Sequence, residues 1–317
     1  MKVLITDKMA NEAIQALKDA DHQVTYDEMD ADTLLNEISK YDGLMVRSRT
    51  KAITEVVKAG AEGNLKVIGR AGVGVDNIDI ETAGKLGIKV VNSPTGSSVS
   101  VAELAFAHML ALVRFVPKAD STMKKGEWIK KQLKGSELSG KKLGLIGSGN
   151  IAQNAARIGN GFGMNVMVYS PNCTDEKAKK MGATLKKLED LLKESDFVSL
   201  HIPHTKDSHF MINEKTLSLM KPSAYLINCS RGGVVDEAAL SKALKDGVIA
   251  GASVDVFEKE PPEDNKFLGL DNVVLSPHLG ANTKEAQIRA GTICAEQMNK
   301  VLKGEKPDFW VNKKFFS

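Results

Sequence analysis

The chain alternates short apolar runs with helix-patterned segments in two successive series, and this alternation is the strongest constraint on its fold. Strands that alternate with helices form parallel sheets that those helices cover. We therefore expect two α/β domains, each with a doubly wound parallel sheet. The strand-like runs are Lys2–Thr6, Gly43–Arg47, Val67–Gly69 and Lys89–Val91 in the first series, and Leu143–Ile146, Val166–Tyr169, Phe197–Leu200, Ala224–Asn228, Ala252–Val256 and Val273–Leu275 in the second.

A long helical segment separates the two series and marks the passage between domains. It starts near Ser98, is broken at Pro117 and leads into a lysine-rich arm that ends at Gly140. A second helical pattern, from Thr283 to Lys303, predicts that the chain returns to its first domain. We expect a substrate-binding domain of residues 1–98 and 284–317, with a dinucleotide-binding domain of residues 99–283 inserted into it.

Composition excludes several classes of protein. The formal net charge of +3 is spread along the chain apart from the stretch Lys124–Lys134, so we expect no nucleic-acid partner. Cys173, Cys229 and Cys294 form no CxxC motif and cannot all pair, which favours a reducing compartment. No apolar run has the character of a signal peptide or the length of a membrane span. These features predict a cytoplasmic protein with no membrane partner and no metal site.

A glycine-rich turn follows the first strand of the second series and opens a helix. The run Gly147–Ala152 stands between the strand-like run Leu143–Ile146 and the helical pattern Gln153–Ile158. The first glycine permits a tight turn, the second admits a pyrophosphate close to the backbone, and the small Ala152 allows the helix to pack on the strand. This context predicts a Rossmann-type site for a nicotinamide dinucleotide.

The end of the next strand is where a dinucleotide fold selects between NAD and NADP. An acidic residue normally binds the adenosine ribose there, but this chain has Ser170. Serine does not repel a 2′-phosphate, and no arginine follows to bind one. The lack of an arginine favours NAD, and NADP stays open.

Arg231, Glu260 and His278 each follow one of the last three strand-like runs. Ligands bind beyond the carboxyl ends of parallel strands, so these side chains are expected to converge on one cleft. An imidazole exchanges protons near neutral pH, a neighbouring carboxylate holds it in place and raises its pKa, and an arginine binds a carboxylate while polarising a carbonyl. We expect hydride transfer at a small 2-hydroxy acid, with His278 as the acid or base.

Each of these residues, taken alone, has an ordinary structural interpretation. A single histidine is more often structural than catalytic, an arginine before two glycines can cap a turn, and Glu258 or Glu260 can be solvated. Three fitting residue types at three successive strand ends favour catalysis. Of the other histidines, His201 ends a strand beside the expected cofactor, whereas the ordinary interpretation is kept for His22, His108, His204 and His209.

Two arginines of the first domain provide a second signal. Arg47 and Arg70 both end strand-like runs in a chain that otherwise uses mostly lysine. Arginine binds carboxylate or phosphate with two parallel hydrogen bonds, which lysine cannot do. The glycines of Ala71–Asp76 expose backbone N–H groups to an anion, although an ordinary glycine-rich turn is the alternative.

Together these motifs resemble those of the D-isomer-specific 2-hydroxyacid dehydrogenases over nearly the whole chain. The resemblance rests on Val46–Ser48, Gly69–Asp79, Gly147–Ala152, Asn228–Glu237, Asp255–Phe257, Glu260–Pro262 and Ser276–Ala281. It implies that Arg231, Glu260 and His278 are catalytic and that Val73, Gly74 and Val75 hold the substrate carboxylate. It also implies cofactor contacts for Val73, Gly147, Gly149, Asn150, Ile151, Ser170, Ile202, Cys229, Ser230, Asp255, Gly280 and Ala281.

Arg47 and Arg70 resemble the phosphate-binding arginines of the family members that oxidise 3-phosphoglycerate for serine synthesis. The resemblance therefore implies that reaction with NAD, in a homodimer joined through the helix and arm of residues 99–139. It also implies that the regulatory domain of longer members is absent, since the sequence stops at Ser317. The departures are Ser170 for the usual aspartate, Ala152 for the third glycine, Lys130 for an arginine, and Thr95 and Ser97 for asparagines common near the substrate. Two alternatives remain, a glyoxylate or hydroxypyruvate reductase of the same family and a non-catalytic dinucleotide sensor that binds partner peptides.

Overall fold

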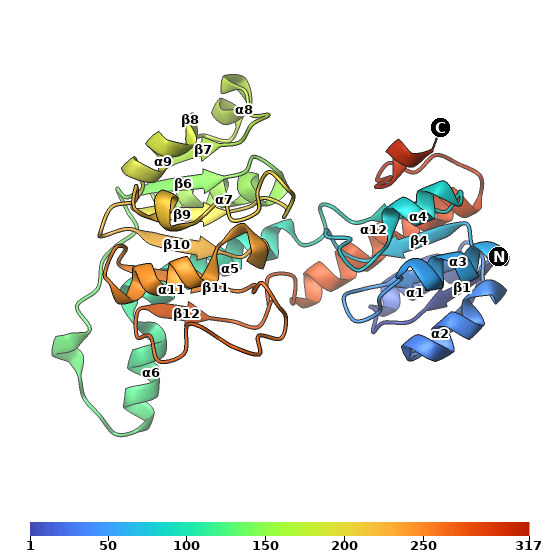
Figure 1. Ribbon diagram of the computed structural model, residues 1–317, viewed down its shortest axis with the longest axis horizontal. Helices are drawn as coiled ribbons and strands as arrows, with labels where there is room; N and C mark the ends of the chain where they lie inside the picture. Colours follow the sequence, from blue (N-terminus) through green and yellow to red (C-terminus); the bar gives the residue numbers. More distant parts are fainter. Residues whose placement is uncertain (317) are drawn as a thin grey trace. The chain divides into compact units, whose positions relative to one another are not determined.

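The computed structural model describes residues 1–316, which form two compact units (Figure 1). One unit consists of Met1–Ser98 with Ala281–Ser317, and the other of Val99–Gly280. Each is a parallel sheet with helices on both faces, and the second interrupts the first along the chain. The predicted fold class is confirmed. Ser317, the last residue of the predicted substrate-binding domain, lies outside the described residues.

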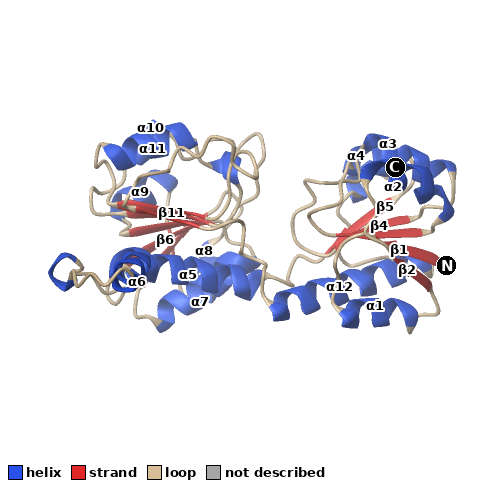
Figure 2. Ribbon diagram, turned by 90° about the horizontal axis from the view of Figure 1, so that it is seen from below, coloured by secondary structure: helices blue, strands red, loops and turns tan. Residues whose placement is uncertain are grey.

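The first unit contains a five-stranded parallel sheet with the strand order β2-β1-β3-β4-β5. Leu4 of β1 packs in the layer of α2, α3 and α4, whereas Val3 and Ile5 pack in the layer of α1 and α12 on the other face (Figure 2). Burial on both faces explains why its inner strands are continuous apolar runs. The elements are β1 Lys2–Ile5, α1 Asn11–Lys18, β2 Gln23–Tyr26, α2 Ala31–Glu37, β3 Gly43–Val46, α3 Thr54–Glu62, β4 Val67–Arg70, α4 Ile80–Lys85, β5 Lys89–Asn92 and α12 Lys284–Leu302.

Two elements of this unit are absent from the sequence-based prediction. The edge strand β2 pairs with β1 alone and none of its four residues is buried, so it has no apolar run. The short helix α2 follows Asp30, whose side chain accepts a hydrogen bond from the Thr33 N–H at 2.8 Å. That cap satisfies a backbone donor at the start of the helix, where the apolar pattern is weak.

The second unit contains a seven-stranded parallel sheet with the order β12-β11-β10-β9-β6-β7-β8. All six predicted strands are present, and the two-residue β8 adds an edge strand. Leu143 and Leu145 of β6 pack in the layer of α5 and α7, whereas Ile146 packs in the layer of α9, α10 and α11. The elements are α5 Ser98–Arg114, α6 Val116–Lys124, β6 Lys142–Ile146, α7 Asn150–Gly161, β7 Asn165–Tyr169, α8 Asp175–Lys180, β8 Thr184–Leu185, α9 Leu188–Glu194, β9 Phe197–Leu200, α10 Glu214–Leu217, β10 Tyr225–Asn228, α11 Glu237–Lys245, β11 Gly251–Val254 and β12 Val273–Leu275.

The break after the long helix lies slightly before the predicted position. Helix α5 ends at Arg114, Phe115 adopts a left-handed conformation with φ 55°, and α6 begins at Val116. Pro117 lies in the first turn of α6, where a missing N–H leaves no helical hydrogen bond unmade. The prediction of a break at Pro117 is therefore wrong in position, because Phe115 makes it.

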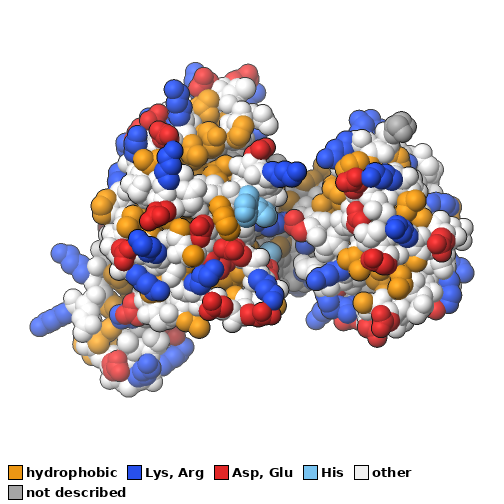
Figure 3. All heavy atoms as spheres, in the orientation of Figure 1, with side chains coloured by type: hydrophobic (Ala, Val, Ile, Leu, Met, Phe, Trp, Pro, Cys, Tyr) orange, Lys and Arg blue, Asp and Glu red, His pale blue; other side chains and the backbone are white. Residues whose placement is uncertain are grey.

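The surface mixes both signs of charge. On the face shown in Figure 3, lysine and arginine side chains are interspersed with aspartate and glutamate side chains. Among residues 1–316 no single helix is long and apolar enough to cross a membrane. The bent pair α5 and α6 reaches that length and apolar composition only when both helices are counted together.

Candidate active site

The site is built at the carboxyl edge of the seven-stranded sheet. Because the strands are parallel, the loops that follow β6, β9, β10, β11 and β12 all leave this edge. Gly147 follows β6, and the loops after the adjacent strands β10, β11 and β12 carry Arg231, Glu260 and His278. The order of the strands explains how residues far apart in sequence reach one region of the unit.

The structure brings Glu260 and His278 into direct contact. The Glu260 Oε2 atom lies 2.7 Å from His278 Nδ1, and the other carboxylate oxygen accepts the Phe257 N–H at 3.1 Å. Burial disfavours the charged form of Glu260, but the hydrogen bonds from His278 and Phe257, with the nearby charges of His278 and Arg231, hold its pKa below the ordinary value. The pair is an ionised carboxylate that fixes one nitrogen of an imidazole.

Arg231 is held beside this pair by its own loop. Its Nη1 donates to the Ser230 carbonyl at 2.7 Å, and its carbonyl accepts from Asn228 Nδ2 at 3.1 Å. The next residue, Gly232, packs so closely on Phe257 that a Cβ would lie 1.9 Å from the Phe257 carbonyl carbon. This close backbone approach joins the Arg231 loop to the loop that carries Glu260, and only glycine permits it.

Hydrogen bonds to Asp255 hold the turn that carries His278. His278 adopts a left-handed conformation with φ 52°, which is uncommon for a residue with a side chain. Its N–H donates to the Asp255 carbonyl at 2.8 Å, and the Asp255 carboxylate accepts the N–H groups of Leu279 at 2.7 Å and Gly280 at 3.0 Å. The Asp255 side chain, expected to contact the cofactor, is fully buried beneath this turn.

The glycine turn after β6 has the geometry of a dinucleotide site. Gly147 has φ 114°, and a Cβ there would lie 2.3 Å from the His201 carbonyl oxygen, so only glycine fits. Gly149 caps α7, whose first turn carries Asn150 and Ile151, with no side-chain cap. A helix that starts without a side-chain cap offers backbone N–H groups to a pyrophosphate, and these residues fit that group.

The remaining predicted cofactor residues of this unit are spread over the same edge. Ser170 is half-buried at the end of β7, and Lys177 of α8 donates to Ser148 in the glycine turn at 3.0 Å. Cys229 and Ser230 are buried after β10, and burial raises the pKa of the Cys229 thiol, which keeps it neutral. Half-buried Ile202 and buried Gly280 complete the set of this unit. Ala281, which is exposed, is the first residue of the segment that returns to the other unit.

His201 ends β9 next to the glycine turn, as predicted. It is buried, its N–H donates to the Ile146 carbonyl at 2.8 Å, and its Nε2 lies 3.0 Å from Ser199 Oγ. Burial lowers the pKa of His201 to about 4, so its ring is neutral at physiological pH. A neutral, buried ring packs beside the glycine turn after β6 and does not act as a charged ligand.

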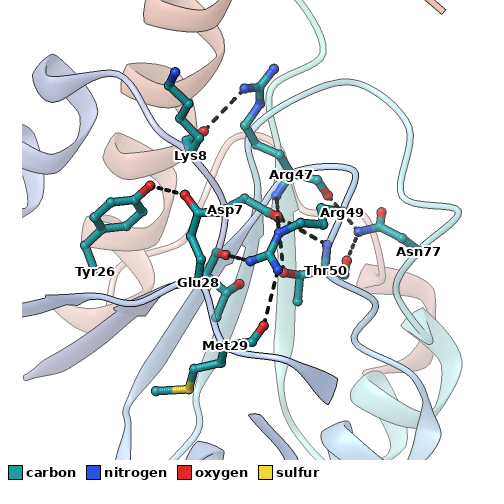
Figure 4. Close-up of polar contacts among 10 residues, drawn as sticks. Asp7, Lys8, Tyr26, Glu28, Met29, Arg47, Arg49, Thr50 and Asn77 are labelled. Atoms are coloured by element: carbon teal, nitrogen blue, oxygen red, sulfur yellow. Dashed lines mark hydrogen bonds and ion pairs between the residues drawn. The ribbon is translucent and has the colours of Figure 1, made fainter. Parts of the chain in front are cut away.

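Arg47 of the first unit directs its guanidinium away from the local acid (Figure 4). The Asp7 carboxylate accepts the Arg47 backbone N–H, the Thr50 hydroxyl at 3.2 Å and Arg49 Nε at 3.2 Å. The Arg47 guanidinium donates to the Lys8 carbonyl at 3.3 Å instead. Arg49, which the sequence does not single out, thus pairs with the Asp7 carboxylate, and the Arg47 guanidinium does not.

Arg70 and the loop after it lie beside Arg47 within the first unit. Val46 and Arg70 are paired residues of the adjacent strands β3 and β4, so Arg47 and Arg70 leave the sheet at the same edge. Arg70 Nη2 donates to Ser48 Oγ at 3.1 Å, and Asn92 Nδ2 donates to the Val73 carbonyl at 2.7 Å. Val73, Gly74 and Val75 are all half-buried in the loop held by Asn92.

A glycine turn of this geometry, with a carboxylate and imidazole pair at the same sheet edge, defines an α/β protein of the dinucleotide-binding class. The family model for the D-isomer specific 2-hydroxyacid dehydrogenase NAD-binding domain matches residues 106–280. The chain belongs to the D-isomer specific 2-hydroxyacid dehydrogenase family, and the predicted resemblance is confirmed.

Known proteins resemble the chain along almost all of its length. It is 47% identical to a D-3-phosphoglycerate dehydrogenase of Methanocaldococcus jannaschii, over 98% of this chain and 59% of that protein. It is 43% identical to a hydroxypyruvate reductase of Thermotoga maritima, over 95% of this chain and 98% of that protein. An acyclic imino acid reductase solved with NADPH and D-Arg superposes with a TM-score of 0.87 at 32% identity, over 98% of this chain and 100% of that one. The chain thus spans about three fifths of the phosphoglycerate dehydrogenase and nearly all of the reductases.

Proposed function

We propose that the chain catalyses the NAD-dependent oxidation of 3-phosphoglycerate to 3-phosphohydroxypyruvate, a step of serine synthesis. The observation that carries the proposal is the 2.7 Å contact between Glu260 and His278, at the sheet edge that also carries the glycine turn. The first four curated relatives, 42% to 47% identical, are each named D-3-phosphoglycerate dehydrogenase, which supports the choice of substrate.

The residues of the site divide the chemistry between them. Bound NAD supplies the acceptor for the hydride that leaves C2 of the substrate. Glu260 occupies Nδ1 of His278, so Nε2 is the nitrogen that accepts the hydroxyl proton as the carbonyl forms. The Glu260 carboxylate compensates the resulting imidazolium charge, and Arg231 binds the substrate carboxylate and polarises the reacting oxygen. In the reverse direction His278 returns the proton.

The first unit is proposed to supply the anion-binding groups. Arg47 and Arg70 bind the substrate phosphate, and the backbone of Val73, Gly74 and Val75 binds its carboxylate. The support is the common edge of the two arginines and the use of Arg49, not Arg47, to pair with Asp7. Two guanidinium groups match the charge and planar geometry of a phosphate better than lysines would.

One assay tests the proposed function directly. Absorbance of the reduced nicotinamide is followed with 3-phosphoglycerate, phosphohydroxypyruvate, glyoxylate and D-lactate, each with the NAD and NADP forms. We expect the largest kcat/KM for the phosphorylated pair. Equal or higher values for glyoxylate would favour a reductase instead. An absence of turnover with every pair would favour a dinucleotide sensor.

A hydroxypyruvate reductase is the second candidate. The specific observation in its favour is the Thermotoga maritima reductase, which this chain covers over 98% of its length. Such an enzyme would use the same Arg231, Glu260 and His278 but would not need phosphate-binding arginines. The phosphate on the substrate is therefore the feature that separates the two candidates.

Replacing Glu260 with glutamine should lower kcat by roughly 10- to 100-fold, because the imidazole loses the charge that orients it and stabilises its protonated form. The matched control is Glu263→Gln, which removes another glutamate of the same loop. Glu263 is exposed and pairs with Lys259 at 2.6 Å, so its loss should leave kcat unchanged. Steady-state kinetics at neutral pH measure both variants, and equal values for the two would exclude a role for Glu260.

We propose NAD as the preferred cofactor and NADP as a weaker one. NAD is favoured because no arginine follows Ser170 to bind a 2′-phosphate. Ser170 does not repel such a phosphate, and Lys177 adds a positive charge beside the glycine turn, which leaves NADP as the weaker cofactor. A structural relative was solved with NADPH, which supports NADP as the weaker cofactor. The preference between NAD and NADP is therefore expected to be weak and to depend on Ser170 at the end of β7.

A carboxylate at position 170 should sharpen that preference. In Ser170→Asp, kcat/KM with NADP should fall roughly tenfold or more, because the carboxylate repels a 2′-phosphate and accepts hydrogen bonds from a free ribose. The value with NAD should stay within about threefold. Ser170→Asn, a neutral side chain of similar size, is the control. An equal loss with both cofactors in the aspartate variant would place the ribose elsewhere.

We propose that the enzyme acts in the cytoplasm as a homodimer joined through residues 99–139. Cys173, Cys229 and Cys294 are all free thiols, as a reducing compartment requires. Trp128 in the arm is 77% exposed, and Val116 and Met123 are also exposed. Exposed apolar side chains grouped in one segment support a protein contact there.

A further inference from the structure

A buried row of polar side chains links helix α5 to the turn that carries His278. His108 of α5 is only 5% exposed. Its Nδ1 contacts Ser253 Oγ, and its Nε2 lies 3.2 Å from Ser276 Oγ. Ser276 Oγ in turn donates to Asp255 Oδ1 at 2.5 Å. Four side chains from α5, β11 and the loops after β11 and β12 therefore make one continuous chain of hydrogen bonds.

This chain of hydrogen bonds ends on the backbone of the loop that carries His278. Asp255 Oδ1 also accepts the Leu279 N–H at 2.7 Å, and Oδ2 accepts the Gly280 N–H at 3.0 Å. These are the two residues after His278, whose left-handed conformation requires support from its surroundings. Whatever fixes the Asp255 carboxylate therefore also fixes the backbone that aims the His278 imidazole.

The Asp255 end of this row of hydrogen bonds determines the direction of the two hydrogen bonds nearest to it. The Asp255 carboxylate accepts from two backbone N–H groups, so the Ser276 hydroxyl must donate its single proton to it. Ser276 Oγ then accepts from His108 Nε2, which places the imidazole proton on that nitrogen. In a neutral ring Nδ1 is then unprotonated and accepts the Ser253 hydroxyl proton. A neutral His108 with its proton on Nε2 fits this arrangement.

The surroundings of His108 agree with a neutral ring. Burial lowers its pKa, although the charge of Asp255 acts in the opposite direction. The Cys229 Sγ atom, 3.9 Å from Nδ1, belongs to a thiol whose pKa burial raises, so it is neutral too. The ring serves as a fixed donor and acceptor between two serines.

We propose that His108 is a positioning residue, which acts through Ser276 and Asp255 to hold the backbone of residues 278–280 and so the direction of the His278 imidazole. The kinetic part of this inference rests on the proposed function, whereas the structural part does not. The sequence alone gives His108 an ordinary structural interpretation, because its hydrogen-bond partners Ser253 and Ser276 lie 145 and 168 residues away along the polypeptide.

Three variants test the chain of hydrogen bonds, two by removing hydrogen bonds from it and one by keeping them. His108→Met removes both hydrogen bonds while filling a similar volume. His108→Gln keeps an amide N–H for Ser276 and a carbonyl oxygen for Ser253. Ser276→Ala cuts the chain between His108 and Asp255. Met109→Ala is the control, because Met109 neighbours His108 on α5, is fully buried, and makes no polar side-chain contact within residues 1–316.

The first readout needs neither cofactor nor substrate. Amide hydrogen exchange of Leu279 and Gly280 is measured in the complete protein. We expect exchange about tenfold faster or more in His108→Met, because a loosened carboxylate holds these two N–H groups less well. His108→Gln should restore the original rates within about threefold. Met109→Ala should lower the melting temperature but leave these two amides as protected as before.

The second readout is turnover. The value of kcat should fall about 10- to 50-fold in His108→Met with the substrate KM within about threefold, and His108→Gln should recover most of it. Adding His108→Met to Ser276→Ala should change kcat less than about threefold further, because the two residues act through one chain.

The inference is overturned if His108→Met leaves both the amide exchange and kcat unchanged, or if Met109→Ala reproduces its effects. Additive losses in the double variant would also overturn it. If the unaltered protein turns over none of the substrates, the proposed function fails, but the exchange experiment still decides the role of His108.

Discussion

Replacing His278 with asparagine is expected to lower kcat by about a thousandfold while the cofactor still binds, because the variant lacks the group that takes the hydroxyl proton. Asparagine is the appropriate replacement, since it tolerates the left-handed conformation that His278 adopts at φ 52°. The measurements are kcat with 3-phosphoglycerate and NAD, and the dissociation constant of NADH from its fluorescence.

His209→Asn provides the control, because His209 is exposed and contacts His204, outside the Glu260 pair. It should retain kcat. If His278→Asn turned over at the rate of the unaltered protein, His278 would not be the acid or base. A loss of NADH affinity as large as the loss of kcat would instead assign His278 to cofactor binding.

Replacing Arg47 with alanine is expected to raise KM for 3-phosphoglycerate by about 10- to 100-fold, the effect of losing charge-assisted hydrogen bonds to a phosphate. The KM for glyoxylate, which has no phosphate, should change by less than about threefold. The guanidinium of Arg47 donates only to a backbone carbonyl, so its removal leaves no local carboxylate without a partner.

Two further variants sharpen this test. Arg47→Lys keeps the charge without the planar fork and should show an intermediate KM. Lys51→Ala removes an exposed charge of the same unit and should have no effect. Equal changes in KM for both substrates in Arg47→Ala would remove the reason for a phosphate site and favour the reductase.

Periodicity was sufficient for the parts of the fold buried on both faces. The inner strands of both sheets and α12 follow their predicted apolar patterns, and the strand ends bring Glu260 against His278 as expected. The glycine turn was predictable because Gly147 stands where no side chain fits. These features depend on local sequence and on the order of parallel strands.

Features that depend on a partner from another segment were not predictable. β2 is half-exposed and exists through its pairing with β1, so its sequence lacks an apolar run. No glycine marks the helix break at Phe115, and the nearby Pro117 led the prediction to place the break two residues too late. Arg49 and His108 contact residues that lie far away in the sequence. The residue type at one position does not predict such contacts.

Glu260, His278 and the Asp255 support beneath them all belong to the single unit Val99–Gly280. The pair proposed to handle the proton is therefore assembled by the folding of one unit.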